Sequence, residues 1–304
     1  MLFRSVATIA LTGIAVYEAK QTNQMVFTQM SSELKGNAEL LLQKQAETES
    51  SRISNYLNDA VIRGQMLTQT LQFQKRFVEE NLLSSEQLRS SITQSMRSAI
   101  EHSELLLGGY ALYLPNLLDG EDAKYVAATD LGGNDKGRVA FYWKKMANGL
   151  LQISAISEKE ISDSTVDENG LQKTEWFLCS QRTQKSCLIE PHADAFYEQA
   201  KLITTITYPV LDSGEVVGVL GIDLPLDPLQ TLVNTMDKQM FNGQGEVLLL
   251  SQRGIVAGST WTGVNTSSNL QKKNPDLAKQ LLPLINSSKN TISWQNGKLQ
   301  IVMP

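Results

Sequence analysis

The sequence predicts an α+β fold in which a long N-terminal stalk helix precedes two domains built on antiparallel sheets. Residues 18–80 contain no proline and only two glycines, and their apolar side chains recur at helical spacing. From Leu105 onward the apolar period changes to two, which is typical of strands, and this pattern repeats on a smaller scale after residue 236. We therefore divide the chain into an N-terminal segment (1–17), the stalk helix (18–80), a larger sheet domain (81–235) and a smaller sheet domain (236–304).

The composition suits a folded protein and excludes nucleic acid as a partner. The 304 residues can hold two modest domains, and a hydrophobic fraction of 41% supplies a sizeable core. The net charge of −5 gives no basic footprint for nucleic acid, and no basic run is interleaved with aromatic residues. The sequence lacks the GxSxG, HExxH, GxGxxG and P-loop motifs, so we expect no enzyme, cofactor or metal site.

The N-terminal segment contains an apolar run from Val6 to Tyr17, behind a single arginine. A complete membrane span needs about 20 apolar residues, and this run is shorter. It is therefore a truncated membrane span or a signal segment, with a buried core helix as a third alternative. Either of the first two places the following residues across a membrane.

The stalk helix has one apolar stripe, and its other faces are mostly Gln, Glu, Ser, Thr and Asn. A helix of roughly sixty residues would extend about 90 Å at the standard rise, which exceeds a globular domain of this size. We therefore expect it to pack along the side of the protein and to mediate a homodimer. A second helix is expected after Ser84, a favoured N-cap residue. The stripes comprise Leu42, Ala46, Ile53, Leu57, Val61, Leu67, Leu71 and Val78 in the stalk helix, and Leu88, Ile92, Met96 and Ile100 in the second helix.

Alternating apolar residues and turn signals define the expected strands. In the larger domain these are Leu106–Leu114, Lys124–Ala128, Val139–Trp143, Leu151–Ile156, Lys201–Leu211 and Glu215–Ile222, followed by a helix near Leu226. In the smaller domain they are Glu246–Ser251, Gly254–Ala257, Thr291–Gln295 and Lys298–Val302, with a helix at Asn274–Ile285.

The hairpin formed by residues 201–222 carries the strongest functional signal. Asp212, Ser213 and Gly214 suit a tight turn, and the strand after it is almost entirely apolar and ends on Asp223. A carboxylate that closes a buried strand is unfavourable to desolvate unless a positive group meets it. Asp223 is therefore either a ligand-binding acid or the cap of the following helix.

Cys179 and Cys187 flank the polar stretch SQRTQKS. Their spacing is too long for a redox CxxC motif, and no further Cys or His is placed to complete a zinc site. Two cysteines on either side of a polar turn suit a disulfide that joins a hairpin in an oxidising compartment. Two unrelated reduced thiols are the alternative.

Three fragments, in order, resemble the double-Cache sensor domains, a PAS-like family found in bacterial methyl-accepting chemotaxis proteins. They are Gly137-Arg138-Val139-Ala140-Phe141-Tyr142-Trp143, then Trp176-Phe177 with Glu190-Pro191-His192, and Gly218-Val219-Leu220-Gly221-Ile222-Asp223. The resemblance covers residues 18–304. It implies that the larger domain is membrane-distal and binds the ligand, that the smaller domain is membrane-proximal, and that Asp223 holds the amino group of a small ligand.

The resemblance also implies the other residues of the site. Aromatic walls exclude solvent and offer cation–π contact to an ammonium group, and Tyr142, Trp143 and Trp176 are the candidates. Family members that recognise polyamines or histamine carry a Tyr-x-Asp motif, which stands here as His192 and Asp194. The remaining candidates are Arg138, for a ligand carboxylate, and Glu190.

Structural alternatives accompany several of these candidates. Trp143 and Trp176 could instead be structural aromatics in the core or on an edge strand. Glu190 can form a turn and pair with Arg138, which is otherwise a surface residue after a turn. His192 as a metal ligand is disfavoured, because the other histidine, His102, falls on a predicted helix.

These features predict the periplasmic sensor region of a chemoreceptor in a bacterial inner membrane. A small amine, polyamine or amino acid would bind the larger domain and shift a conformational equilibrium that the long helix transmits. Two alternatives stay open. The same domain could serve a histidine kinase or a cyclic-dinucleotide enzyme, or the chain could be a secreted coiled-coil scaffold without a pocket.

Overall fold

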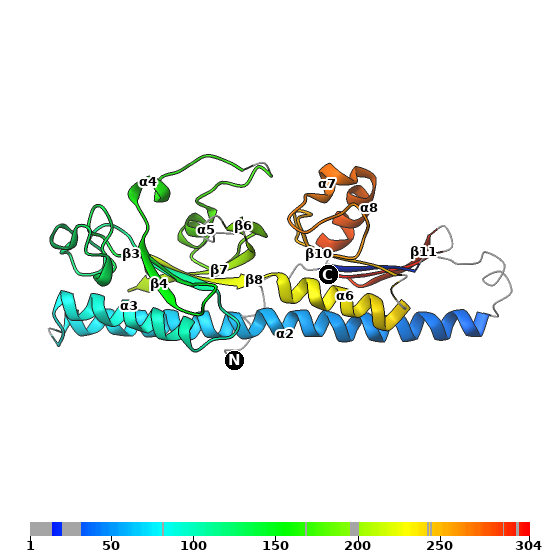
Figure 1. The fold of residues 1–304 in the computed structure, drawn as a ribbon, viewed down its shortest axis with the longest axis horizontal. Coiled ribbons are helices and arrows are strands. Elements are labelled where there is room, and N and C mark those ends of the chain that lie inside the picture. Colours follow the sequence, from blue (N-terminus) through cyan, green and yellow to red (C-terminus); the bar gives the residue numbers. More distant parts are fainter. Residues whose placement is uncertain are drawn as a thin grey trace.

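The computed structural model describes residues 14–19, 32–80, 82–167, 169–194, 201–241, 243, 245–287, 289–295 and 298–304. Two antiparallel sheets lie side by side along one long helix, and shorter helices cover the opposite faces of both sheets (Figure 1). This architecture confirms the predicted α+β fold.

The long helix, α2 (Ser32–Glu79), begins later than predicted. Its 48 residues extend about 70 Å at the standard rise, beneath both sheets (Figure 1). Residues Ile14–Ala19 form strand β1 between two strands of the smaller sheet. Glu18 and Ala19 therefore belong to a strand, whereas the sequence predicted them in the stalk helix. The alternating, partly β-branched sequence IAVYEA suits a strand, and the pairing partners lie far along the chain. Residues 1–13, the rest of the expected membrane or signal segment, lie outside the described residues.

No helix in the described part of the chain combines the length and the hydrophobicity that a membrane crossing requires.

Helix α3 (Ser85–Glu101) packs against α2 and begins at the predicted cap. The Ser84 hydroxyl accepts from the Gln87 amide at 3.2 Å, and the Gln87 side chain accepts from the Ser84 amide at 2.9 Å. This capping box satisfies two amides that would otherwise lack partners. Leu88, Ile92, Met96 and Ile100 are fully buried, as their spacing predicts.

The larger sheet has the strand order β4-β3-β2-β8-β7-β5, with β6 also paired to β7. Its strands are β2 (Gly108–Tyr113), β3 (Ala140–Lys145), β4 (Leu151–Ala155), β5 (Cys187–Leu188), β6 (His192–Asp194), β7 (Lys201–Asp212) and β8 (Glu215–Pro225). Its short helices are η1 (Asp122–Tyr125), η2 (Thr129–Leu131), α4 (Glu158–Ile161) and α5 (Glu175–Thr183).

The strand expected at Lys124–Ala128 is wrong, because its first residues belong to η1. Tertiary contacts override the local preference there. Asp122 bonds the Asn116 amide and the buried guanidinium of Arg89, which fixes this loop over α3.

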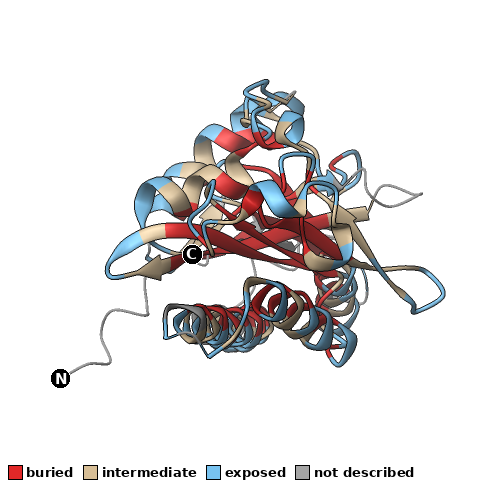
Figure 2. Cartoon of the chain, turned by 90° about the vertical axis from the view of Figure 1, so that its left-hand side faces the viewer, coloured by how far each residue is buried: buried red, intermediate tan, exposed pale blue. Residues whose placement is uncertain are grey.

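The two faces of the larger sheet belong to different cores. Ala111, Phe141, Leu220 and Ile222 join the core shared with α2 and α3. Their neighbours in sequence, among them Tyr110, Tyr142 and Val219, join a smaller core on the face covered by α4 and α5. Because side chains alternate along a strand, adjacent residues serve different layers, and the buried strands form the middle layer in Figure 2.

The smaller sheet has the order β10-β9-β1-β12-β11, so it combines both ends of the described chain. Helix α6 (Asp227–Phe241) follows β8 directly and lies beside α2 under this sheet (Figure 1). The other elements are β9 (Gly245–Leu250), β10 (Val256–Ser259), α7 (Leu270–Lys273), α8 (Pro275–Asn286), β11 (Thr291–Gln295) and β12 (Lys298–Met303).

Candidate ligand-binding site

A cavity of about 210 Å³ lies on the face of the larger sheet that is turned away from α2 and α3. Strands β2, β3, β7 and β8 form its floor, and α4 and α5 contribute to its walls. Of the residues proposed from the sequence, four line this cavity: Asp223, Tyr142, Trp176 and His192.

Asp223 lies in the floor of the cavity and is only 3% exposed. It is paired with Gly108 of β2 and Thr205 of β7, and its Oδ1 accepts a hydrogen bond from the Thr205 hydroxyl at 2.6 Å. Strand β8 continues to Pro225 before α6 begins at Asp227, so Asp223 is within a strand and does not cap the helix.

Three aromatic side chains surround the cavity. The rings of Tyr110 and Trp176 meet edge to face with centroids 4.8 Å apart, and the Tyr110 hydroxyl donates to the Trp176 carbonyl. Tyr110 lies over Gly221, where an added Cβ would come within 2.1 Å of its ring. Burial, with a contribution from the charge of Asp223, raises the pKa of Tyr110, which therefore remains a neutral hydrogen-bonding phenol.

Acidic groups outnumber basic groups in the lining. Glu160 and Asp163 join Asp223, while Lys173 is the lysine among the lining residues. Lys173 lies 3.5 Å from Asp163 and is more than half exposed. Its charge is therefore well solvated, whereas Asp223 is desolvated. The floor of the cavity thus favours a cation.

His192 reaches the cavity from β6. Its Nδ1 lies 2.9 Å from the Glu190 carbonyl, which leaves Nε2 as the ring nitrogen available to a ligand. Asp194 ends β6 opposite Lys201, but its side chain lies outside the described part of the structure, so its role stays a prediction.

Three other candidates do not line this cavity, so their part in ligand binding stays a prediction. Trp143 points into the core on the other face of the sheet, where its Nε1 donates to the Thr93 carbonyl at 3.0 Å. Arg138 is buried and forms a 2.6 Å ion pair with Glu158. Glu190 lines a different cavity, between the two sheets.

Several lining residues were missed by the sequence reasoning: Tyr110, Ile156, Glu160, Asp163, Lys173, Ile203 and Thr205. Tyr110 had a usable signal, because it lies on the predicted strand Leu106–Leu114, on the same face as Gly108 two residues before it. Glu160, Asp163 and Lys173 had none, since they sit on a short helix and loops that only the tertiary fold brings to the sheet.

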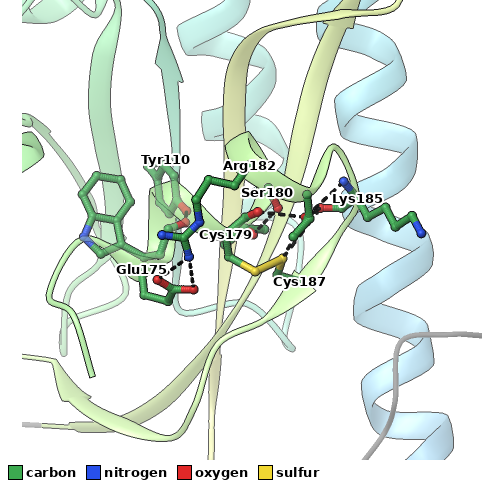
Figure 3. Close-up of a disulfide and its surroundings, with 10 residues drawn as sticks. Tyr110, Glu175, Cys179, Ser180, Arg182, Lys185 and Cys187 are labelled. Atoms are coloured by element: carbon green, nitrogen blue, oxygen red, sulfur yellow. Dashed lines mark hydrogen bonds and ion pairs between the residues drawn. A yellow bond between two sulfur atoms is a disulfide. The ribbon is translucent and has the colours of Figure 1, made fainter. Parts of the chain in front are cut away.

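The disulfide between Cys179 and Cys187 is present, with Cα atoms 6.2 Å apart. It connects α5 to strand β5, not the two strands of a hairpin as predicted. Figure 3 shows the bond beside the Arg182–Glu175 ion pair of α5, the helix that also carries Trp176. The bond therefore fixes the helix that forms one wall of the cavity.

Replacing both cysteines by alanine should lower the free energy of unfolding by about 2 kcal/mol, because the unfolded chain is no longer closed into a short loop and gains conformational entropy. It should also weaken ligand binding, since α5 is released from β5. Urea unfolding and calorimetry on the oxidised protein and on the double variant measure both effects. Equal stability and equal affinity would show that the disulfide is not needed to hold α5 in the cavity wall.

Gly108→Ala should distort the ligand cavity by displacing the Tyr142 ring. A Cβ there would come within 2.3 Å of the Tyr142 hydroxyl and 2.8 Å of the Trp143 carbonyl, so the Tyr142 ring must move. Such overpacking costs about 1–3 kcal/mol and should reduce ligand affinity. Gly36→Ala is the control, because its added Cβ would meet no atom within 4 Å among the described residues, apart from its own helical neighbours. Thermal unfolding and titration of both variants test this; unchanged binding in Gly108→Ala would remove Tyr142 from the wall.

The chain is similar to curated and solved proteins over most of its length, although no family model matches it. It is 30% identical over 294 residues to the methyl-accepting chemotaxis protein TlpQ of Pseudomonas aeruginosa. That alignment covers 97% of this chain and 41% of TlpQ, so the chain spans less than half the length of this relative.

Two solved structures illustrate the shared fold. The periplasmic sensory domain of the Campylobacter jejuni chemoreceptor Tlp1 matches with a TM-score of 0.60 and 16% identity, covering 89% of this chain and 96% of that domain. The ligand-binding domain of the Pseudomonas aeruginosa amino acid chemoreceptor PctC, in complex with GABA, matches with a TM-score of 0.51 and 14% identity, covering 88% and 99%.

Proposed function

This chain is a homologue of a methyl-accepting chemotaxis protein and has the fold of chemoreceptor sensor domains, and from this premise we propose that it senses a small amine-containing ligand for a transmembrane chemoreceptor. The relationship inferred from the sequence motifs is thereby confirmed. In the proposal, residues 81–235 form the membrane-distal, ligand-binding domain and residues 236–304 the membrane-proximal domain.

The buried carboxylate of Asp223 is the observation that carries the ligand class. It is desolvated in a cavity with aromatic walls and an excess of acidic groups, which suits an ammonium group. PctC, which has the same fold, is in complex with GABA, a molecule with a primary amine. Ligand binding here would proceed without covalent chemistry.

Lys173 separates two subclasses of ligand. Arg138 is paired with Glu158 and does not line the cavity, so Lys173 is the candidate partner for the carboxylate of an amino acid. A simple amine or polyamine would use Asp223, and a second amino group would meet Asp163 or Asp194.

The route from the cavity to α2 is short. Two residues after Asp223, the Pro225 carbonyl accepts a hydrogen bond from the Tyr56 hydroxyl of α2 at 2.7 Å. On the neighbouring strand, Tyr208 donates to the Val61 carbonyl of α2 at 3.1 Å. A shift of the β7–β8 hairpin on binding would therefore move α2, which passes beneath both sheets.

We also propose a homodimer through α2 and a periplasmic location anchored in the inner membrane. Ile62, Met66 and Phe73 of α2 are each more than half exposed and recur at helical spacing. The disulfide suits an oxidising compartment. The homology to TlpQ favours a chemotaxis output over a kinase or cyclic-dinucleotide enzyme, and the cavity argues against a scaffold without a pocket.

A thermal-shift screen of amines, polyamines, amino acids and organic acids tests the proposal. A ligand that binds only the folded protein raises its melting temperature by mass action. We expect shifts from compounds with a primary amine and none from acids that lack one. Shifts from the acids alone would contradict the proposed ligand class.

A further inference from the structure

A second cavity, of about 270 Å³, lies between the two sheets and α2. Ile53 and Leu57 of α2, Leu226 and Leu229 near the start of α6, and Leu249 and Ala257 of the smaller sheet form its apolar walls. It is thus bounded by the long helix and by segments of both sheet domains. We call it the inter-domain cavity.

One carboxylate faces these apolar walls. Glu190 lines the cavity, and its Oε2 is buried without a hydrogen-bond partner among the described residues. Burial raises the pKa of Glu190, and contacts with the Ser251 side chain and with Arg253 offset part of this shift. A buried acceptor without a donor is unfavourable, so a bound molecule that donates a hydrogen bond would relieve this cost.

The inter-domain cavity and the cavity at Asp223 share two segments. On β7, Thr204 lines the first and Thr205 the second, because neighbouring residues of a strand point to opposite faces. In the segment that precedes β7, Glu190 lines the inter-domain cavity and His192 lines the cavity at Asp223. The His192 ring also contacts the Glu190 carbonyl. A molecule in one cavity therefore touches backbone that also shapes the other.

We propose that the inter-domain cavity is a second binding site, which takes a small primary amine with a branched aliphatic body. The aliphatic part would pack between Leu57, Leu229 and Leu249, and the ammonium group would donate to Glu190. Through Thr204 and Glu190 its occupancy would alter the affinity of the cavity at Asp223, and linkage requires the reverse effect to be equal.

Methyl NMR of the chain, titrated with 3-methylbutylamine, tests this proposal and locates the amine. The methyl groups of Ile53, Leu57 and Leu229 report on the inter-domain cavity, and those of Ile156 and Ile203 on the cavity at Asp223. We expect saturable shifts in the first group. Glu190→Gln should weaken that binding by about tenfold or more without abolishing the response of Ile156 and Ile203 to ligands of the other cavity.

Ala257→Leu, which narrows the inter-domain cavity, is a second variant that should also remove the shifts of Ile53 and Leu57. 3-Methylbutanol should bind more weakly than the amine, because it lacks the charge. Shifts confined to Ile156 and Ile203, equal binding of the alcohol, or unchanged binding in Glu190→Gln would each overturn the proposal. The first of these results would leave the proposed function at Asp223 intact.

Discussion

Asp223→Asn is expected to weaken the binding of an amine ligand by about 2–4 kcal/mol, the cost of removing one partner from a desolvated charge pair. Asparagine retains the size of the side chain and can still accept a hydrogen bond from the Thr205 hydroxyl, which donates to Asp223 at 2.6 Å in the native protein. Folding should be intact or slightly improved, because a buried carboxylate is removed from the empty site. Calorimetry measures the affinity, and urea unfolding measures the stability.

Three further variants test which groups of the ligand are recognised. Asp163→Asn is the matched control, because Asp163 lies in the same cavity but is one-third exposed and paired with Lys173, so the loss should be smaller. Lys173→Ala should abolish the binding of an amino acid and leave the binding of a simple amine unchanged or stronger. Asp194→Asn should cost little for a ligand with one amino group and nearly as much as Asp223→Asn for a diamine.

Arg89→Met is expected to destabilise the fold by about 3–5 kcal/mol, since it leaves buried carboxylates without a counter-charge. The Arg89 side chain is fully buried and bonds Asp119 at 2.6 Å, Asp122 at 2.9 Å and the Gly137 carbonyl at 2.7 Å. Burial lowers the pKa of Arg89, but the bonds to both aspartates outweigh this effect and raise it. The guanidinium therefore stays charged.

Arg63→Met is the control for this result. Arg63 forms a 2.9 Å ion pair with Asp59 on the exposed face of α2, with about half of each side chain in solvent. Such a pair contributes about 0–1 kcal/mol, so urea unfolding should show little change. If Arg89→Met proved as mild as Arg63→Met, the loop around Asp122 would be held by its other contacts.

The strands and helices of this protein were largely predictable, because they depend on local patterns. Strands β11 and β8 and helices α3 and α8 follow from alternation, turn signals and caps. Strand β1 was not predictable in the same way, since it is inserted between β9 and β12 from a distant part of the sequence. Helix α5 was also missed, and the disulfide was assigned to a hairpin for that reason.

The site was only partly predictable, because both faces of the larger sheet are buried. Alternation separates Tyr142 from Trp143 but does not say which of them faces the cavity. The partner of Asp223 shows a second limit. Counting outward from the turn pair Asp212–Glu215 places Thr204 opposite Asp223, whereas the irregularity after Val210 brings Thr205 there instead. Such a bulge has no clear signal in the sequence.

A crystal structure of the chain in complex with an amine found in the thermal-shift screen tests the central claim most directly. The account predicts the ammonium group within hydrogen-bonding distance of Asp223, between Tyr142 and Trp176, in the cavity of the larger sheet domain. A ligand bound only to the smaller sheet domain, or one whose amine points away from Asp223 into solvent, would contradict it.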